Sequence, residues 1–179
     1  MSTVAVSEVP GESLAQELEE LFRTHYQLVY RTAYSVTGSA EDAEDVLQSL
    51  FLRFVGRGFP SDLRKNPKGY LYRAAFNQSL NIVRSRKRHA AAGDAERIEI
   101  PAPATDSEFA EEIDKRLYEA IADLDPKAAE ILILRYVHDC SDAEIAKLLG
   151  RSRGSIAVSL FRSRARLKKR IRESFGEKL

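Results

Sequence analysis

Basic and hydroxyl side chains recur at helical spacing near the C-terminus, where they can donate hydrogen bonds to a polyanion. Residues 151–172 hold nine Lys or Arg side chains and no Asp or Glu. At about 100° per residue, Ser159, Arg162 and Arg166 fall on the same face of a helix as Ser155. A separate arc holds the apolar residues Ile156, Leu160, Leu167 and Ile171. The sequence therefore predicts a helix with one packing face and one face for phosphates or base edges.

A short capped helix and a tight turn precede this basic helix. Ser141 and Glu144 have the spacing of a capping box. Gly150 then predicts a turn, after which Arg151 and Arg153 open the basic helix. Together these elements form a helix-turn-helix pattern, whose second helix enters the major groove of DNA. Because an ordinary exposed helix gains from mixed charges at i,i+4 spacing, uniform positive charge favours nucleic-acid contact over a merely solvated surface.

A second polar stripe lies on the helix predicted for residues 67–89. Its members carry hydrogen-bond donors and fall within an arc of about 80°: Tyr70, Arg73, Asn77, Asn81, Arg84 and Arg88. In single-strand binding, cations hold the backbone and aromatic faces stack on bases, while Asn and Arg can read base edges. Tyr72 and Phe76 lean away from the stripe, so we expect them to pack in the core.

Charge alternates in blocks along the chain, although the formal net charge is only +1. Residues 1–50 carry 2 Lys or Arg against 9 Asp or Glu, and residues 51–90 carry 10 against 1. Residues 91–150 carry 6 against 15, and residues 151–179 carry 10 against 2. Solvated helix faces would mix the two signs within each block. Two basic blocks therefore indicate two contacts with a polyanion, and we expect the acidic blocks to cover them in a compact free protein.

The apolar pattern is helical wherever it is regular, which predicts an all-α protein of two small helical domains. We predict a disordered tail at 1–11, a first domain at 12–90, a flexible linker at 91–110 and a helix-turn-helix domain at 111–175. No run approaches about 18 apolar residues, so we predict no membrane insertion. A single cysteine, Cys140, fits a reducing cytosol, and we expect a cytoplasmic protein.

Residues that often serve catalysis are scattered along the chain rather than grouped. His25, His89, His138 and Cys140 match no metal-binding or nucleophile motif. We therefore predict no catalytic residue, no metal site and no cofactor. An acidic edge at residues 41–45 lies near a predicted helix N-terminus, where acidic side chains are favourable through the helix dipole alone. The residue types of this acidic edge do not by themselves identify a binding partner.

Two sets of motifs resemble the two domains of extracytoplasmic-function (ECF) sigma factors. Asp42-Ala43-Glu44-Asp45-Val46-Leu47-Gln48 is similar to region 2.2 of sigma domain 2, and residues 66–77 are similar to regions 2.3 and 2.4. The motifs at 124–126, 132–136, 144–150 and 154–164 resemble sigma domain 4. Both domains stand in the order typical of this family and are joined by a short linker. The middle domain of larger sigma factors is missing, as in this family type.

The resemblance implies a sigma factor that binds core RNA polymerase and directs promoter recognition, −10 melting and transcription initiation. Region 2.2 would dock on the β′ clamp helices through Asp42, Glu44, Asp45 and Gln48. The stripe from Tyr70 to Arg88 would bind and open the −10 element of promoter DNA. The −35 element would meet Arg151, Arg153, Ser155, Ser159, Arg162 and Arg166, while another surface of domain 4 meets the β flap. The resemblance also implies an anti-sigma factor as a partner, and no enzyme activity.

The start of the last helix departs from the family pattern. The family usually shows Thr-Val-Lys-Ser-Arg where residues 155–159 are Ser-Ile-Ala-Val-Ser, so two basic positions are absent. Arg151 and Arg153 stand close by and compensate in charge. The alternative is a stand-alone helix-turn-helix regulator, which needs a ligand or phosphoacceptor domain that residues 14–90 do not show. A pure interaction protein such as an anti-sigma factor would not need two basic faces.

Overall fold

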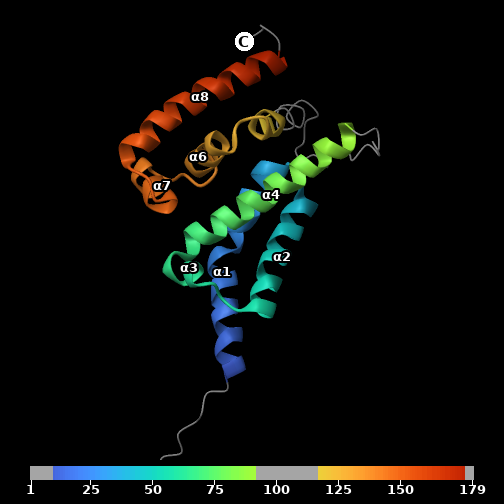
Figure 1. The fold of residues 1–179 in the computed structure, drawn as a ribbon, viewed down its shortest axis with the longest axis vertical. Helices are drawn as coiled ribbons and strands as arrows, with labels where there is room; N and C mark the ends of the chain where they lie inside the picture. The colour runs from blue at the N-terminus through green and yellow to red at the C-terminus, as the bar shows by residue number, and fades with distance from the viewer. Residues whose placement is uncertain (1–9, 92–116, 176–179) are drawn as a thin grey trace, which may run out of the picture.

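The computed structural model describes residues 10–91 and 117–175 of the 179-residue chain. Every regular element in these ranges is helical, which confirms the all-α prediction. The labelled helices are α1 (Pro10–Thr37), α2 (Ala40–Arg57), α3 (Ser61–Lys65), α4 (Pro67–Ala91), α6 (Pro126–Tyr136), α7 (Asp142–Leu149) and α8 (Arg153–Phe175), and residues 117–122 are helical as well. In Figure 1, α4 runs between α1 and α2 on one side and α6 to α8 on the other. Within the described ranges, no helix is long and apolar enough to cross a membrane.

The first group of helices, α1 to α4, buries its own apolar core. Its buried members are Val29 and Ala33 of α1, Ala43, Val46, Leu50, Phe51 and Phe54 of α2, Leu63 of α3, and Leu71 and Ala75 of α4. Their spacings of three, four and seven residues put each set on one face of its helix. This packing holds α4 against α1 and α2 along one side.

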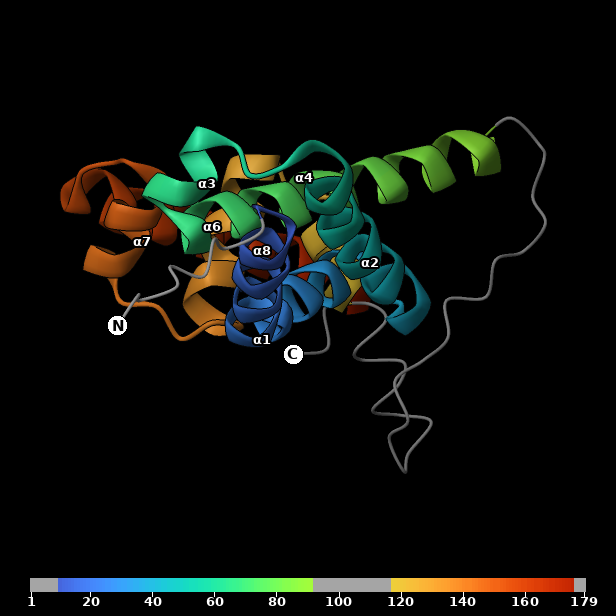
Figure 2. The ribbon, with the colours of Figure 1, turned by 90° about the horizontal axis from the view of Figure 1, so that it is seen from below.

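A second core joins this first group to the helix-turn-helix group, α6 to α8. Figure 2 shows the helices of the two groups next to each other. Tyr72, Phe76 and Leu80 of α4 lie in one cluster with buried residues of α6, α7 and α8. The Tyr72 hydroxyl donates a hydrogen bond of 2.7 Å to the backbone carbonyl of Glu130 in α6. The packing predicted for Tyr72 and Phe76 is therefore confirmed, but they pack against the other domain. The molecule is compact through this apolar interface. Ion pairs also join acidic blocks to basic ones, as between Asp42 and Arg86, Asp123 and Lys87, and Asp125 and Arg166.

His138, in the loop between α6 and α7, adds a polar contact to this interface. Its Nε2 lies 2.8 Å from the hydroxyl oxygen of Thr32 in α1. The Thr32 hydroxyl proton is donated to the Leu28 carbonyl at 2.7 Å, so Nε2 must be the donor in the first bond. Burial, reinforced by the positive charges of Arg31 and Lys68, lowers the pKa of His138 to about 4. The interface therefore holds a neutral imidazole at neutral pH.

Two segment boundaries differ from the sequence-based expectations. Helix α1 begins at Pro10, inside the predicted 1–11 tail, because proline suits the first turn of a helix. The glycines and prolines at positions 56, 58, 60 and 67 predict a loop in this part of the sequence. The structure has helix α3 there, at Ser61–Lys65, which the sequence does not reveal because five residues are too few to show a helical period. Residues 1–9 of the predicted tail and residues 92–110 of the predicted linker lie outside the described residues.

Candidate nucleic-acid interface

The polar stripe predicted on α4 forms an exposed face of that helix. Tyr70 is half-buried, and the other members, Arg73, Asn77, Asn81, Arg84 and Arg88, are exposed. Asn66 caps the helix, because its Oδ1 accepts the backbone N–H of Gly69 at 3.0 Å. A Cβ on residue 69 would lie 2.4 Å from the Asn66 side-chain nitrogen, so glycine lets this cap close. The cap fixes the start of the helix and with it the position of Tyr70.

A cavity of about 540 Å³ opens at the N-terminal end of this stripe. The α3–α4 cavity is lined by Asp62, Lys65, Asn66, Tyr70, Arg73, Ala74 and Asn77. The Tyr70 ring packs against Phe54 with 6.2 Å between ring centroids, which steadies the ring at the wall of the cavity. An aromatic ring, two amide side chains and two cations therefore meet in one hollow. These groups are suited to stack on a base, read its edge and hold its phosphates.

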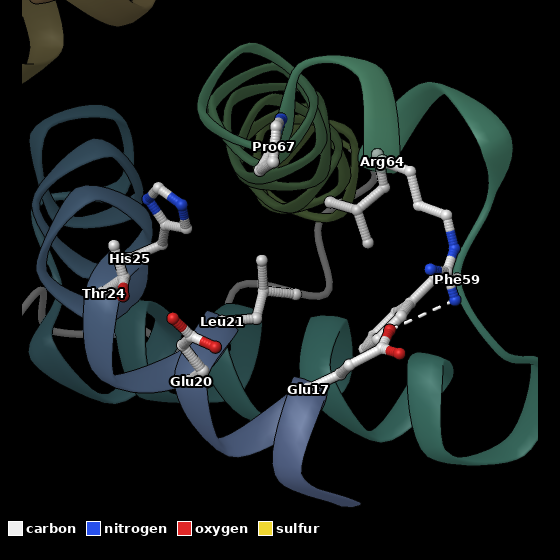
Figure 3. Close-up of a pocket in the computed structure, with 9 residues that line it drawn as sticks. Glu17, Glu20, Leu21, Thr24, His25, Phe59, Arg64 and Pro67 are labelled. Atoms are coloured by element: carbon white, nitrogen blue, oxygen red, sulfur yellow. Dashed lines mark ion pairs between the residues drawn. The ribbon is translucent and has the colours of Figure 1, made fainter. Parts of the chain in front are cut away.

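A smaller cavity of about 280 Å³ lies on the other side of α3 (Figure 3). Its apolar walls include Leu21, Phe59 and Leu63, and Arg64 forms an ion pair of 3.1 Å with Glu17 across its rim. None of its lining residues is among the predicted site residues. Because its rim carries the carboxylates of Glu17 and Glu20, this cavity does not suit a phosphate-bearing ligand.

Arg73 connects the α4 stripe to the helix-turn-helix group. Its guanidinium donates a hydrogen bond of 2.8 Å to the backbone carbonyl of Leu148, near the end of α7. The same guanidinium lies near Glu130, whose pKa is nevertheless raised because burial outweighs the nearby positive charges of Arg73 and Arg151. A nucleic acid in the α3–α4 cavity would therefore compete with α7 for Arg73.

The four residues of α2 that were predicted to contact core polymerase have different environments: one is largely buried and three are exposed. The Asp42 side chain is only 14% exposed and forms an ion pair with Arg86 of α4. Its pKa is raised, because burial outweighs the attraction of the Arg86 guanidinium. Glu44, Asp45 and Gln48 are exposed, so these three side chains remain accessible to a partner. Asp42 instead ties α2 to α4.

The helix-turn-helix forms as the sequence predicts. The Ser141 hydroxyl accepts the Glu144 N–H at 3.3 Å, and the Glu144 carboxylate accepts the Ser141 N–H at 2.8 Å, which completes the capping box. Hydrogen bonds from the Ser141 side chain and backbone lower the pKa of Glu144. Gly150 ends α7 in the left-handed conformation with φ +65°, where a side chain would be strained. These local signals fix the turn between α7 and α8.

The face of α8 predicted to bind DNA lies partly against α6. Ile156 and Leu160 are buried as predicted. Ser155 and Ser159 are half-buried, and Ser159 accepts a hydrogen bond of 3.1 Å from Arg151. Arg166 forms an ion pair with Asp125, the N-cap residue of α6. A shallow cavity beside α6 brings together four predicted residues, Arg151, Ser159, Arg162 and Arg166.

The outward side of α8 carries residues that sequence reasoning did not select. Phe161 is 74% exposed and Val158 is 51% exposed. Arg162 and Arg153 are exposed as well, so two predicted cations remain available on the surface. The sequence contains a signal for this exposed side. On a helical wheel, Val158 lies directly opposite the buried residues Ile156 and Leu160, and Arg162 lies close to Val158. The clustering of hydroxyl and basic residues led to the neighbouring face instead.

The described residues offer no alternative chemical centre. Within residues 10–91 and 117–175, no group of three His, Cys, Asp or Glu side chains could hold a metal ion. Cys140 is buried, and burial raises the pKa of its thiol, which disfavours the reactive thiolate. The exposed basic faces therefore remain the principal candidate site.

Comparisons with known proteins agree with this arrangement. The family description "Sigma-70 region 2" matches residues 21–89, and "Sigma-70, region 4" matches residues 114–167. These two matches cover the α4 stripe and the helix-turn-helix with most of α8.

The chain is also similar to curated sigma factors along most of its length. It is 30% identical over 169 residues to the ECF RNA polymerase sigma factor SigE of Mycolicibacterium smegmatis, covering 92% of this chain and 65% of that protein. It is 28% identical over 162 residues to the RNA polymerase sigma-E factor of Streptomyces coelicolor, covering 90% of this chain and 88% of that one.

A solved structure shares the fold. The sigma factor RpoE of Bartonella quintana, crystallised in complex with the anti-sigma factor NepR, superposes with a TM-score of 0.56 at 19% identity. The match covers 88% of this chain and 98% of that one. The two sigma-70 regions in order, together with the similarity to curated sigma factors over 90% and 92% of this chain, place the chain in a single family. This chain belongs to the ECF sigma factor family.

Proposed function

We propose that this chain binds core RNA polymerase and directs it to promoters, where it helps to open the −10 element. The observation that carries the proposal is the exposed α4 stripe beside the α3–α4 cavity, in a chain that also presents a basic helix-turn-helix. Polymerase performs the chemistry, and the sigma factor supplies recognition. The family of the chain supports this division of labour.

At the −10 element, the proposed role of the α3–α4 cavity is to hold a base that has left the duplex. Unstacking a base costs a few kcal/mol, which a stacking partner and hydrogen bonds can offset. Tyr70 supplies the ring, Asn77 supplies both donors and acceptors, and Arg73 and Lys65 supply positive charge for the backbone. Asn81, Arg84 and Arg88 extend the exposed face along the helix, where they would track the following nucleotides.

At the −35 element, α8 would enter the major groove, with Arg153 and Arg162 as exposed cations near its N-terminal half. In the structure described here, Arg151 and Arg166 have protein partners, so they would support this contact from its edge. Ser155 and Ser159 are half-buried and would reach DNA only at the margin of the groove.

Polymerase would be held at two places, as in the family. Glu44, Asp45 and Gln48 of α2 would contact the β′ clamp helices, and the exposed Leu52 and Val55 on the same helix would add apolar contact. Asp42 would act indirectly through its ion pair with Arg86. A second surface, on domain 4, would meet the β flap.

An anti-sigma factor is a further proposed partner, because the related Bartonella quintana protein was crystallised with one. In the structure, the first group of helices is closed against the helix-turn-helix group, and Arg73 donates a hydrogen bond to α7. An anti-sigma factor would have to bind this closed form or open it. It would therefore either stabilise this closed form or separate the two helical groups. Size-exclusion chromatography with scattering would distinguish a compact complex from an opened one.

Run-off transcription tests the proposal directly. Purified chain is added to core RNA polymerase from a related bacterium over a library of genomic promoters. We expect new, discrete start sites that depend on the added chain, and co-elution of the chain with core polymerase. If neither occurs, the proposed function is wrong, and a stand-alone DNA-binding regulator becomes the better hypothesis.

A further inference from the structure

Two large apolar side chains stand together on the outward side of α8. Val158 and Phe161 are 51% and 74% exposed, and their i,i+3 spacing puts them next to each other on the helix surface. We call them the apolar pair. Ile156 and Leu160, on the opposite side of α8, already supply the contacts that fix the helix in the fold. The apolar pair is therefore not needed for folding.

Apart from Arg162, which is exposed and lies one turn from Val158, few polar side chains that could read bases stand around the apolar pair. Residue 157 is alanine, and Ser159 accepts a hydrogen bond from Arg151. Tyr136 is the hydrogen-bond acceptor for Arg164, whose guanidinium also lies over the Tyr136 ring. The outward surface of α8 is thus an apolar centre flanked by cations, rather than a row of hydrogen-bond donors.

This combination fits one feature of the major groove. Thymine alone presents a methyl group there, and apolar side chains make favourable contact with it. Flanking cations hold the phosphates on either side and set the register without reading the sequence. A partner protein is a less fitting occupant, since residues 151–172, which include most of α8, carry nine cations and no acid. Such uniform charge favours a polyanion.

We propose that Val158 and Phe161 read thymine methyl groups at the −35 element, so that this chain selects its promoters partly by apolar contact. The inference rests on the proposed function, because it requires α8 to lie in the major groove. It goes further by naming the base and the chemical group that are recognised. It also gives a role to the Ser-Ile-Ala-Val-Ser sequence at residues 155–159, which has no Arg, Lys, Asn or Gln side chain to hydrogen-bond to bases.

Replacement of thymine by uracil tests the inference without changing a single base-pair hydrogen bond. The −35 thymines of a promoter found by run-off transcription are replaced by deoxyuridine, one at a time, and holoenzyme binding is measured. We expect about a fourfold loss of affinity for each methyl group in contact, the size expected for burial of one carbon group. Equal binding to both DNAs, with normal transcription from the thymine promoter, would overturn the inference and leave the proposed function standing.

Variants of the apolar pair complete the test. Phe161→Ala and Val158→Ala should weaken binding to the thymine promoter and abolish the difference between thymine and uracil. Tyr136→Ala, which removes another exposed aromatic side chain of the same domain, should retain that difference. Arg162→Ala should weaken both DNAs equally, because a phosphate contact does not sense the methyl group.

Three other outcomes count against the inference. Loss of core polymerase co-elution in Phe161→Ala would make the apolar pair a protein-docking surface. A −35 motif without any A·T pair would leave it with no methyl group to read. Absence of transcription from every promoter would overturn the proposed function and the inference together.

Discussion

Helices α4 and α8 carry most of the cations of the two basic blocks of the sequence, and the fold holds these helices in different ways. Leu71 and Ala75 of α4 pack into the first core, while Tyr72 and Phe76 pack into the core shared with α6 to α8. Burial on two sides leaves only one stripe of α4 for a ligand. Helix α8 buries residues along a single side, so a broad surface remains exposed. The comparison shows that packing selects the functional face on α4 and leaves several faces open on α8.

The largest expected effect compares the same substitution on the two helices. Phe76 is 2% exposed in the shared core, whereas Phe161 is 74% exposed. Phe76→Ala should lower the free energy of unfolding by about 3–5 kcal/mol, because it leaves a cavity. Phe161→Ala should change it by less than about 0.5 kcal/mol. Urea denaturation measures both values, and similar losses for the two variants would contradict the assignment of Phe76 to a core between the domains.

This contrast also marks what could be predicted from the sequence. The α4 stripe, the capping box at Ser141 and the turn at Gly150 depend on local spacing, and the structure has all three. The destination of Tyr72 and Phe76 could not be predicted, because their partners in α6 to α8 lie more than 40 residues away in the chain. Helical periodicity says that a side chain is buried but does not name the element that buries it.

The candidate site was predicted less completely on α8 than on α4. Helical spacing predicted the buried arc of α8 correctly. Several faces beside that arc carry basic residues, so spacing alone does not select the face that binds DNA. The pairing of Arg166 with Asp125 depends on how α6 lies against α8, which local spacing does not contain. The same is true of Asp42 and Arg86 between α2 and α4. Interpretation by residue type therefore favoured cations that the fold uses internally, and missed the exposed Val158 and Phe161.

The next largest effect concerns the ring at the α3–α4 cavity. Tyr70→Ala should reduce open-complex formation by about 5- to 150-fold, since stacking of a base on an aromatic ring contributes about 1–3 kcal/mol. Tyr70→Phe keeps the ring and should retain most of the activity. Permanganate footprinting of the −10 element measures the effect, with core polymerase co-elution as the control. Full melting by Tyr70→Ala would show that this cavity does not hold the base.

A pH effect should report on the interface between the two helical groups. The pKa of His138 is lowered from 6.5 to about 4 in the folded protein, so the unfolded chain binds the extra proton between these values. Stability from this group is therefore complete above pH 6.5 and is lost as the pH falls toward 4. Between pH 7.5 and pH 5 the loss should reach up to about 2 kcal/mol.

His138→Gln provides the reference for this pH effect. Urea denaturation of both proteins at pH 7.5 and pH 5 gives the difference that belongs to His138, because His25, Asp42 and Glu130 titrate in both. Wild type should lose more stability than the variant on acidification. A variant that loses as much would mean that the His138 ring is not held neutral against Thr32.

The smallest effect tests whether an internal ion pair removes an arginine from DNA binding. Each basic helix offers a matched pair of arginines. On α4, Arg84 is exposed and Arg86 is paired with Asp42, while on α8, Arg162 is exposed and Arg166 is paired with Asp125.

A cation that contacts a phosphate releases a counterion from the DNA and adds about one unit to the slope of log affinity against log salt. Arg84→Ala and Arg162→Ala should therefore each lower the slope for holoenzyme binding to promoter DNA by about one. Arg86→Ala and Arg166→Ala should leave it nearly unchanged, because a guanidinium held by a carboxylate contacts no phosphate and so displaces no counterion from the DNA. Equal slopes for the two members of a pair would mean that the ion pair opens when DNA binds, and the internal carboxylate would then act as a competitor for the phosphate.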